Sequence, residues 1–310
     1  MKGVTEMKRK AAVLPYVLIA PTLLFVVVFT IFPLIKSIFS SLYIQRLNLP
    51  KYRDPLWTGL GNFRKIFHDE VFLQVLSNTA VYIAILVPLC VVTAFLFALM
   101  LHSAGRSGVG QNNQIGGKLK GLYRTAFFYP TVIPMVSAAT IWMFFFTPGY
   151  GLFNKFLEIF GYHGAQNWIA NPNLALFAII ITAFWKSAGY YMIFYLAGLQ
   201  NLPQHVFEAA KLDGAGPFRT LFSITLPLLK RTNLFVITVT FIGAFQSVDH
   251  VFVLTGGGPS DRSSLLLFHL WQVRFENLNV GEASAITVVL VVFLLVFTIT
   301  NFVFSEQKER

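Results

Sequence analysis

The chain has 310 residues, of which 55% are hydrophobic and 12% charged, whereas a soluble domain carries roughly 25% charged residues. This composition excludes a large soluble domain and indicates a polytopic membrane protein, with 33 phenylalanines suited to lipid-facing and bundle-filling positions. The net charge of +11 comes from basic residues at the ends of apolar segments, which favours topology signals and lipid-headgroup contacts over nucleic-acid binding.

The predicted fold is all-α, a polytopic transmembrane bundle with six spans. A spanning helix needs about 20 mostly apolar residues. The segments that qualify, in chain order, are about Ala11–Ser40, Val75–Leu101, Thr125–Phe146, Leu174–Leu199, Asn233–Leu254 and Ala283–Phe304. The first segment follows a basic stretch, but it is too long for the apolar part of a signal peptide and no small-x-small cleavage site follows, so we expect a retained helix.

The second predicted span contains Pro88, and the third contains Pro130 and Pro134. Neighbouring helices can satisfy the backbone groups that a proline frees within a membrane. These prolines indicate either helices that bend with a moving gate or the ordinary prolines of membrane helices, and both interpretations stay open.

Lysine and arginine are more frequent in alternate connecting segments, beginning with the N-terminal one. The positive-inside rule therefore places both termini and the loop at about 200–231 in the cytoplasm. The predicted organisation is a cytoplasmic tail over 1–10, a transmembrane permease-like domain over 11–304 and a second cytoplasmic tail over 305–310.

A polar, helix-forming island, EAAKLDGAG at 208–216, separates the fourth and fifth predicted spans. We expect Glu208 to lie at the start of a helix, Gly214 to supply the turn that ends it, Pro217 to begin a second helix and Leu226-Pro227 to end that one. Small apolar residues allow close approach of another protein, whereas the alternative is an ordinary amphipathic interfacial helix. The candidate docking residues are Glu208, Ala209, Ala210, Lys211, Asp213, Gly214, Ala215 and Pro217.

The spacing EAA-x-x-D-G-A followed by I-x-L-P resembles the cytoplasmic signature of ABC-importer permeases. Further motifs between about residues 14 and 304 are similar to those of one subfamily: GNF at 61–63, YP at 129–130, GLFN at 151–154, AGLQ at 197–200 and LTGGGP at 254–259. The chain therefore resembles the carbohydrate-type permeases of binding-protein-dependent importers, which handle oligosaccharides, polyols and glycerol-3-phosphate.

This resemblance implies a type I importer permease in a prokaryotic plasma (inner) membrane, which moves solute by alternating access. It implies three protein partners: a second homologous permease, an ABC ATPase dimer that docks on the island, and an extracytoplasmic solute-binding protein. ATP and Mg²⁺ would be bound by the ATPase, so this chain is expected to hold no cofactor and to be no enzyme.

Two glycine-containing stretches raise the question of a phosphate site. The TGGGP run at 255–259 lacks the GK[ST] ending of a P-loop, and we expect a tight turn at the outer mouth instead. The stretch from Gly110 to Lys118 ends in Gly-Lys, but Leu119 follows, so it is no P-loop either.

Ionisable and polar groups inside spans are costly and usually face a cavity or a partner. The candidate substrate-pathway residues are Lys186, Tyr190, Tyr191, Gln246 and Asp249. The alternative for Lys186 is a structural pairing with an acid or with helix carbonyls. We expect Lys36 to snorkel toward an interface and Asn301 to hydrogen-bond between helices.

Neither catalysis nor a metal site is indicated, because the six histidines are scattered and show no HExxH or Cys/His spacing. His250 is interpreted as a loop histidine. Two rival functions remain at this point: a secondary carrier driven by an ion gradient, and a scaffold that transports nothing. Carriers often show internal repeats and acids within the membrane, and neither is evident here. An oligosaccharide is the favoured substrate over glycerol-3-phosphate.

Overall fold

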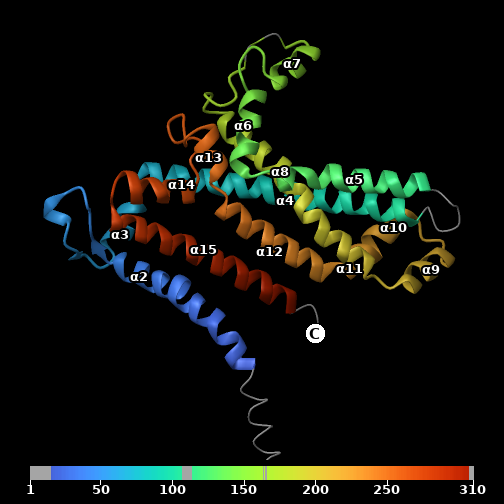
Figure 1. Ribbon diagram of the computed structural model, residues 1–310, viewed down its shortest axis with the longest axis horizontal. Coiled ribbons are helices and arrows are strands. Elements are labelled where there is room, and N and C mark those ends of the chain that lie inside the picture. The colour runs from blue at the N-terminus through green and yellow to red at the C-terminus, as the bar shows by residue number, and fades with distance from the viewer. Residues whose placement is uncertain (1–14, 107–113, 163, 165, 307–310) are drawn as a thin grey trace, which may run out of the picture. The chain divides into compact units, whose positions relative to one another are not determined.

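The computed structural model describes residues 15–106, 114–162, 164 and 166–306, and helices dominate this part of the chain (Figure 1). Five of its helices are long and apolar enough to cross a membrane: Pro15–Ser40, Glu70–His102, Ala175–Gln200, Lys230–Leu254 and Val280–Val303. They coincide, within a few residues at each end, with all the predicted spans except the third. The tail 1–10, the end of the tail 305–310 and part of the stretch 110–118 lie outside the described residues.

The third predicted span is not one continuous helix. It is split between α5 (Gln114–Val132) and α6 (Met135–Phe145), which are bent by 100° at their junction. Pro134 is the reason, because a residue before proline is pushed out of the helical region and proline itself donates no backbone hydrogen bond. Its backbone is extended, with φ −55° and ψ 144°. By contrast, Pro88 and Pro130 lie within continuous helices.

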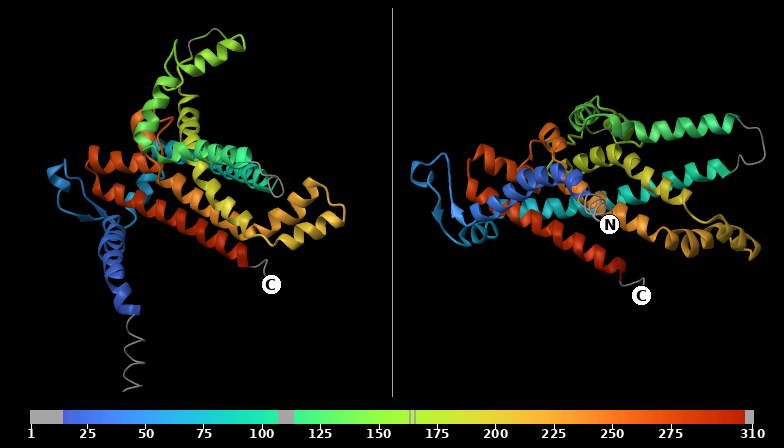
Figure 2. Two further views of the ribbon diagram at one scale, coloured as in Figure 1. Left: turned by 45° about the vertical axis from the view of Figure 1, so that its right-hand side comes forward. Right: turned by 60° about the horizontal axis from the view of Figure 1, so that its bottom comes forward.

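The chain divides into two compact units, residues 70–269 with 293–310 and residues 1–69 with 270–292. The first of these, the bundle unit, is built on α4 (Glu70–Arg106) and α8 (Ala175–Gln200), which pack against each other and are flanked by α5 and α12 (Lys230–Gln246) (Figures 1 and 2). Tyr82, Met192 and Tyr195 are fully enclosed in its core. The Phe97 and Phe127 rings stack with centroids 4.0 Å apart, fastening α4 to α5.

The helices of the bundle unit carry apolar residues on several faces, as expected where one face meets protein and another meets lipid. On α4, Leu86, Cys90 and Ala94 are buried, while Leu89 and Val92 are exposed. On the last helix, α15 (Val280–Glu306), Asn301 Nδ2 donates hydrogen bonds to the Leu234 carbonyl oxygen and to Thr238 Oγ1 of α12. The prediction that Asn301 bonds between helices is confirmed.

Short elements join these helices. In the bundle unit they are α7 (Leu152–Ile159), α13 (Asp249–Leu254) and the start of α14 (Leu266–Trp271). Asn154 fixes the α7 segment, because its Nδ2 donates to the Gln166 carbonyl oxygen at 2.9 Å and its Oδ1 accepts from Trp168 Nε1 at 3.1 Å. Trp142, Phe146 and Phe153 pack around this point. The α7 segment is therefore held in place by these hydrogen bonds and by aromatic packing.

The second unit, the loop unit, contains the first span, which includes η1 (Val27–Ile31) and α2 (Phe32–Ser40). Its other elements are the antiparallel strands β1 (Tyr43–Ile44) and β2 (Leu56–Trp57), η2 (Pro50–Tyr52), α3 (Gly61–Ile66) and η4 (Gln272–Glu276). Asn62 of the GNF motif holds the hairpin, because its Nδ2 donates to the carbonyl oxygens of Ser41 at 2.8 Å and Tyr43 at 2.9 Å.

Candidate functional site

The polar island folds as a helical bracket, a name used here for residues 204–228. It comprises α9 (Gln204–Leu212), α10 (Pro217–Thr220), η3 (Leu221–Thr225) and α11 (Leu226–Leu228). Gly214 adopts φ +70°, which glycine reaches without strain. The Ala215 N–H donates to the Ala210 carbonyl oxygen at 2.9 Å, which closes the turn after α9. The predicted helix-turn-helix is confirmed.

Two details of the predicted bracket are wrong. Glu208 lies in the second turn of α9 and not at its start, because the helix begins at Gln204, directly after Pro203. The first turn of α9 therefore contains no acidic residue. Leu226-Pro227 does not end the second helical stretch, which continues through Leu228 before α12 begins. Proline is tolerated there because it occupies the first turn of α11.

The bracket presents polar and apolar side chains away from the bundle. Glu208, Ala209 and Asp213 are exposed, whereas Ala210 is buried. Two large apolar side chains are also uncovered, Leu212 at 90% and Phe218 at 77% exposure. Sequence reasoning singled out the small residues and missed these two. The sequence pattern that could have indicated them is a large apolar residue next to a charged one within the polar island. Packing within the chain does not cover these two side chains.

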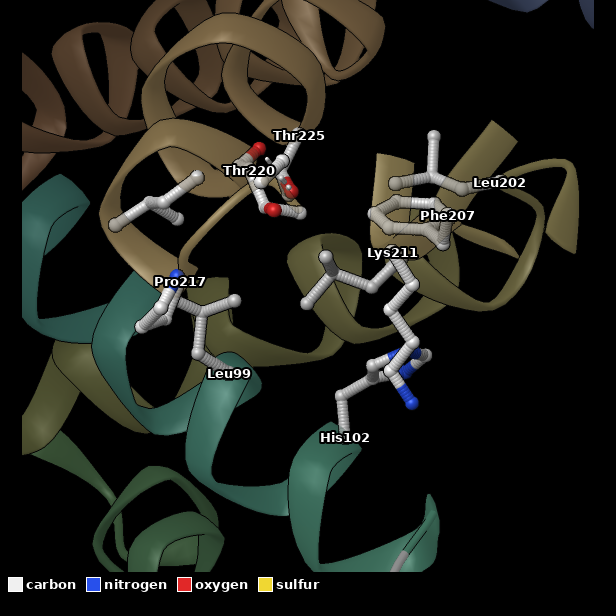
Figure 3. Close-up of a pocket in the computed structure, with 11 residues that line it drawn as sticks. Leu99, His102, Leu202, Phe207, Lys211, Pro217, Thr220 and Thr225 are labelled. Carbon is white, nitrogen blue, oxygen red and sulfur yellow. Dashed lines mark hydrogen bonds between the residues drawn. The ribbon is translucent and has the colours of Figure 1, made fainter. Parts of the chain in front are cut away.

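Behind the bracket lies a cleft of about 470 Å³, shown in Figure 3. Leu99 and His102 of α4 form one side, and Phe207, Lys211 and the η3 segment form the other. The Lys211 side chain extends from α9 toward His102 (Figure 3). The predicted docking residues therefore divide into two sets, because Lys211, Ala215 and Pro217 line this cleft while Glu208, Ala209 and Asp213 do not.

Lys186, within the fourth span, is anchored to the α5 end of the broken span. Its Nζ donates to the Thr131 carbonyl oxygen at 3.4 Å, and Thr131 Oγ1 donates to the Lys186 carbonyl oxygen at 3.3 Å. The charge of Asp249, at the start of α13, also acts on the ammonium, without a direct ion pair. Of the structural alternatives for Lys186 made from the sequence, contact with a helix carbonyl is present.

The other candidate pathway residues do not share one surface. Tyr190 and Gln246 are exposed, whereas Tyr191 is buried with its hydroxyl close to Gly243 of α12. The two tyrosine rings meet edge to face, with centroids 5.3 Å apart. The structure places Lys186 against Thr131 and leaves Tyr191 as part of the packed bundle.

His250 is not a loop histidine, which corrects the expectation. It lies in α13 with no exposed surface. Its Nε2 is 3.2 Å from the Tyr82 hydroxyl of α4, and its Nδ1 is 3.4 Å from Ser247 Oγ. A buried polar ring needs such partners, so His250 joins α13 to α4.

The TGGGP run forms the predicted tight turn. Gly256 and Gly257 have φ of +57° and +83°. A Cβ at Gly257 would lie 2.7 Å from Phe268, so only glycine fits there. Ser263 Oγ donates to the Gly258 carbonyl oxygen at 2.5 Å, and Asn78 Nδ2 donates to the Asp261 carbonyl oxygen at 2.7 Å. The turn is therefore bound to the start of α4.

Comparisons with known proteins place these features in context. Residues 104–306 match the model of the family "Binding-protein-dependent transport system inner membrane component". The chain is 31% identical over 300 residues to the probable ABC transporter permease protein YurN of Bacillus subtilis, covering 96% of this chain and 98% of YurN. It is 31% identical over 298 residues to the sn-glycerol-3-phosphate transport system permease protein UgpA of Yersinia enterocolitica, covering 96% and 95%.

Two solved structures share the fold. A chain of a bacterial ABC transporter involved in the import of the acidic polysaccharide alginate superposes with a TM-score of 0.79 at 20% identity, covering 99% of both chains. A chain of the alginate transporter in complex with its alginate pentasaccharide-bound periplasmic protein gives a TM-score of 0.77 at 20% identity, covering 96% of this chain and 94% of that one. These two chains support the type I importer-like bundle predicted from the sequence, and the family match disfavours an ion-gradient-driven carrier.

Proposed function

Because the chain belongs to the family of binding-protein-dependent transport system inner membrane components, we propose that it passes a sugar or related polyol across the membrane by alternating access. Its place in the complex is that of a multi-pass permease subunit. The solute crosses along the bundle unit, and hydrolysis of ATP takes place in a separate ATPase subunit. No cofactor is required of this chain in this scheme, since ATP and Mg²⁺ belong to the ATPase.

The observation that carries the proposal is the exposure of the helical bracket. Leu212 at 90% and Phe218 at 77% exposure lie beside the exposed carboxylates of Glu208 and Asp213. A soluble partner that covers these side chains would gain apolar burial together with charge contacts. The bracket is short, held by the Gly214 turn and separated from α12 by Leu229 alone. A force applied to it would therefore reach a membrane-spanning helix.

In this scheme an ABC ATPase dimer binds the exposed surface of the bracket. It contacts the bracket of this chain and that of a second, homologous permease. An extracytoplasmic solute-binding protein delivers solute to the opposite side. This assignment places both termini and the bracket in the cytoplasm. The membrane is then the plasma (inner) membrane of a prokaryote. Nucleotide shifts the conformational equilibrium only through contacts that differ between the inward-open and outward-open states.

The Lys186 site favours a neutral polyhydroxy solute over a phosphorylated one. A solute such as glycerol-3-phosphate needs a cation free to pair with its phosphate, and Lys186 Nζ already donates to the Thr131 carbonyl oxygen. Tyr190 is 42% exposed and lies one turn beyond Lys186, so an aromatic face is available beside hydrogen-bonding groups. Sugars are bound by this combination. The relatives that carry glycerol-3-phosphate in their names make that solute the second candidate.

The bracket variant Leu212→Ser tests the docking assignment. Covering one leucine contributes about 1.5–3 kcal/mol, so the affinity for the ATPase is expected to fall roughly 10- to 100-fold. Pull-down of the ATPase and solute-stimulated ATP hydrolysis in proteoliposomes containing the full complex would measure this. Glu208→Lys and deletion of residues 209–214 are expected to abolish transport.

Ser223→Ala, on an exposed position of η3, is the matched control and is expected to behave as the parent. Uptake that survives deletion of residues 209–214 would refute the docking assignment. Solute uptake without any solute-stimulated ATP hydrolysis would revive the carrier, and the absence of both would point to a scaffold.

A further inference from the structure

The cleft behind the bracket lies where two membrane spans end. The apolar part of α4 ends near His102, after which the helix continues to Arg106, and the span on α8 ends at Gln200. The cleft is lined by residues at these two ends, Leu99 and His102 on one and Leu199 on the other. Because the ends of spanning helices lie at the boundary between hydrocarbon and water, the cleft opens at the level of the lipid headgroups.

The lining of the cleft is amphipathic in the way a phospholipid is. Leu99, Leu199 and Phe207 provide an apolar surface, and Lys211 brings a cation to its edge beside the imidazole of His102 (Figure 3). Glu208 of α9 and Asp213, which directly follows α9, do not line it. Phe207 and Lys211 are four residues apart and so lie on one face of α9. Its volume of about 470 Å³ is within the range of small-molecule sites, roughly 300–1,000 Å³.

We propose that this cleft binds an anionic phospholipid of the leaflet that faces the bracket. The phosphate lies between Lys211 and His102, and the first methylenes of an acyl chain lie on Leu99 and Leu199. Such a lipid contacts α4 and α9 at once, so it links the bracket to the end of a span. The site is separate from the exposed Leu212 and Phe218 surface, and the inference requires neither transport nor the proposed ATPase contact.

Photoactivatable phosphatidylglycerol is the probe for this site. The full-length chain is reconstituted in vesicles of equimolar phosphatidylcholine and phosphatidylglycerol, illuminated, digested and mapped by mass spectrometry. Labelling is expected on the segment 199–207 and at the end of α4, and it should exceed labelling by photoactivatable phosphatidylcholine. Each basic residue near a membrane surface contributes a factor of about five in binding, so Lys211→Gln should reduce labelling about fivefold. Lys211→Arg should restore it.

Arg219→Gln is the matched control, because Arg219 is an exposed basic residue of α10 that does not line the cleft, and its labelling should equal that of the parent. Leu99→Trp should lower labelling by filling the cleft, with size-exclusion chromatography confirming that each variant stays folded. Equal labelling by the two lipids, or equal losses in Lys211→Gln and Arg219→Gln, would overturn the proposal and leave the cleft to a protein segment. Suppression of labelling by added inorganic phosphate would also overturn it, in favour of a free-phosphate site.

Discussion

At the scale of single residues, Glu282 shows how the loop unit holds a buried charge. Its side chain is 8% exposed, and it accepts hydrogen bonds from Lys65 Nζ and from Asn279 Nδ2 at 2.6 Å, with Arg46 Nη2 at 4.0 Å. Asn279 in turn caps α15, because its Oδ1 accepts from the Glu282 N–H at 3.3 Å. Asn279 thus satisfies one free backbone amide at the helix start, and Glu282 in return accepts from the Asn279 side-chain amide.

Replacing Glu282 should therefore destabilise the loop unit, and the loss should be larger for alanine than for glutamine. Glu282→Ala leaves a buried amide without its acceptor and is expected to cost about 2 kcal/mol in unfolding free energy. Glu282→Gln keeps an acceptor and loses the ion pairs with Lys65 and Arg46, whose side chains are 50% and 34% exposed, so it should cost about 1 kcal/mol or less. Thermal unfolding of the purified protein in detergent measures both. The exposed Glu276→Ala is the control, and equal midpoints for all three variants would contradict the role of the cap.

At the scale of elements, the bracket depends on a single left-handed turn. Gly214 has φ +70° with open space around its missing side chain, whereas Gly216 has φ −69° with equally open space. Gly214→Ala should therefore cost about 1–2 kcal/mol through the backbone alone, and Gly216→Ala should cost much less. Hydrogen exchange of the α9 amides is the measurement, with faster exchange expected only in Gly214→Ala. Gly214→Asn should lie between them, because asparagine tolerates this conformation. Equal exchange in the two alanine variants would show that the turn does not hold α9.

The same elements show how far the sequence can predict this structure. The spans and the bracket can be predicted from local rules. Long apolar runs predict the spans, and Gly214 and Pro217 predict the turn and the start of the second helix in the bracket. The sequence does not indicate the start of α9, because Gln204 and its neighbours carry no strong cap signal. The helix begins at Gln204, directly after Pro203. The 100° bend between α5 and α6 was signalled by Pro134 as a kink, but its size is set by how α6 packs on α13 and α8.

The candidate sites show the limit of local rules more sharply. The cleft joins side chains of α4, α8, α9 and η3, whose proximity is a property of packing and not of spacing along the chain. The contact of Lys186 with Thr131 is likewise tertiary, because the two residues are 55 positions apart. His250 was misread for the same reason, because its partner Tyr82 lies 168 positions away.

At the scale of the whole molecule, one span separates the two polar features of the bundle unit. The candidate span Lys230–Leu254 has 25 residues and consists of α12 and α13 with a break at Ser247 and Val248. Its length is within the roughly 17–25 residues that cross a hydrocarbon core of about 30 Å. The bracket lies directly before it and the TGGGP turn directly after it. The two are therefore expected on opposite sides of the membrane. A soluble partner bound to the bracket would then be separated by the membrane from anything that binds at the turn.

Single-cysteine labelling tests this arrangement. The native thiol of Cys90 is fully buried, so Cys90→Ala supplies a silent background. In this background, Asp213→Cys in the bracket and Tyr150→Cys before α7 place reporters at exposed positions. A membrane-impermeant maleimide should label residue 150 in intact cells and residue 213 only after permeabilisation, because Lys and Arg favour the cytoplasmic side around the bracket. Labelling of residue 213 in intact cells would place the bracket outside, and docking of a cytoplasmic ATPase on it would then be impossible.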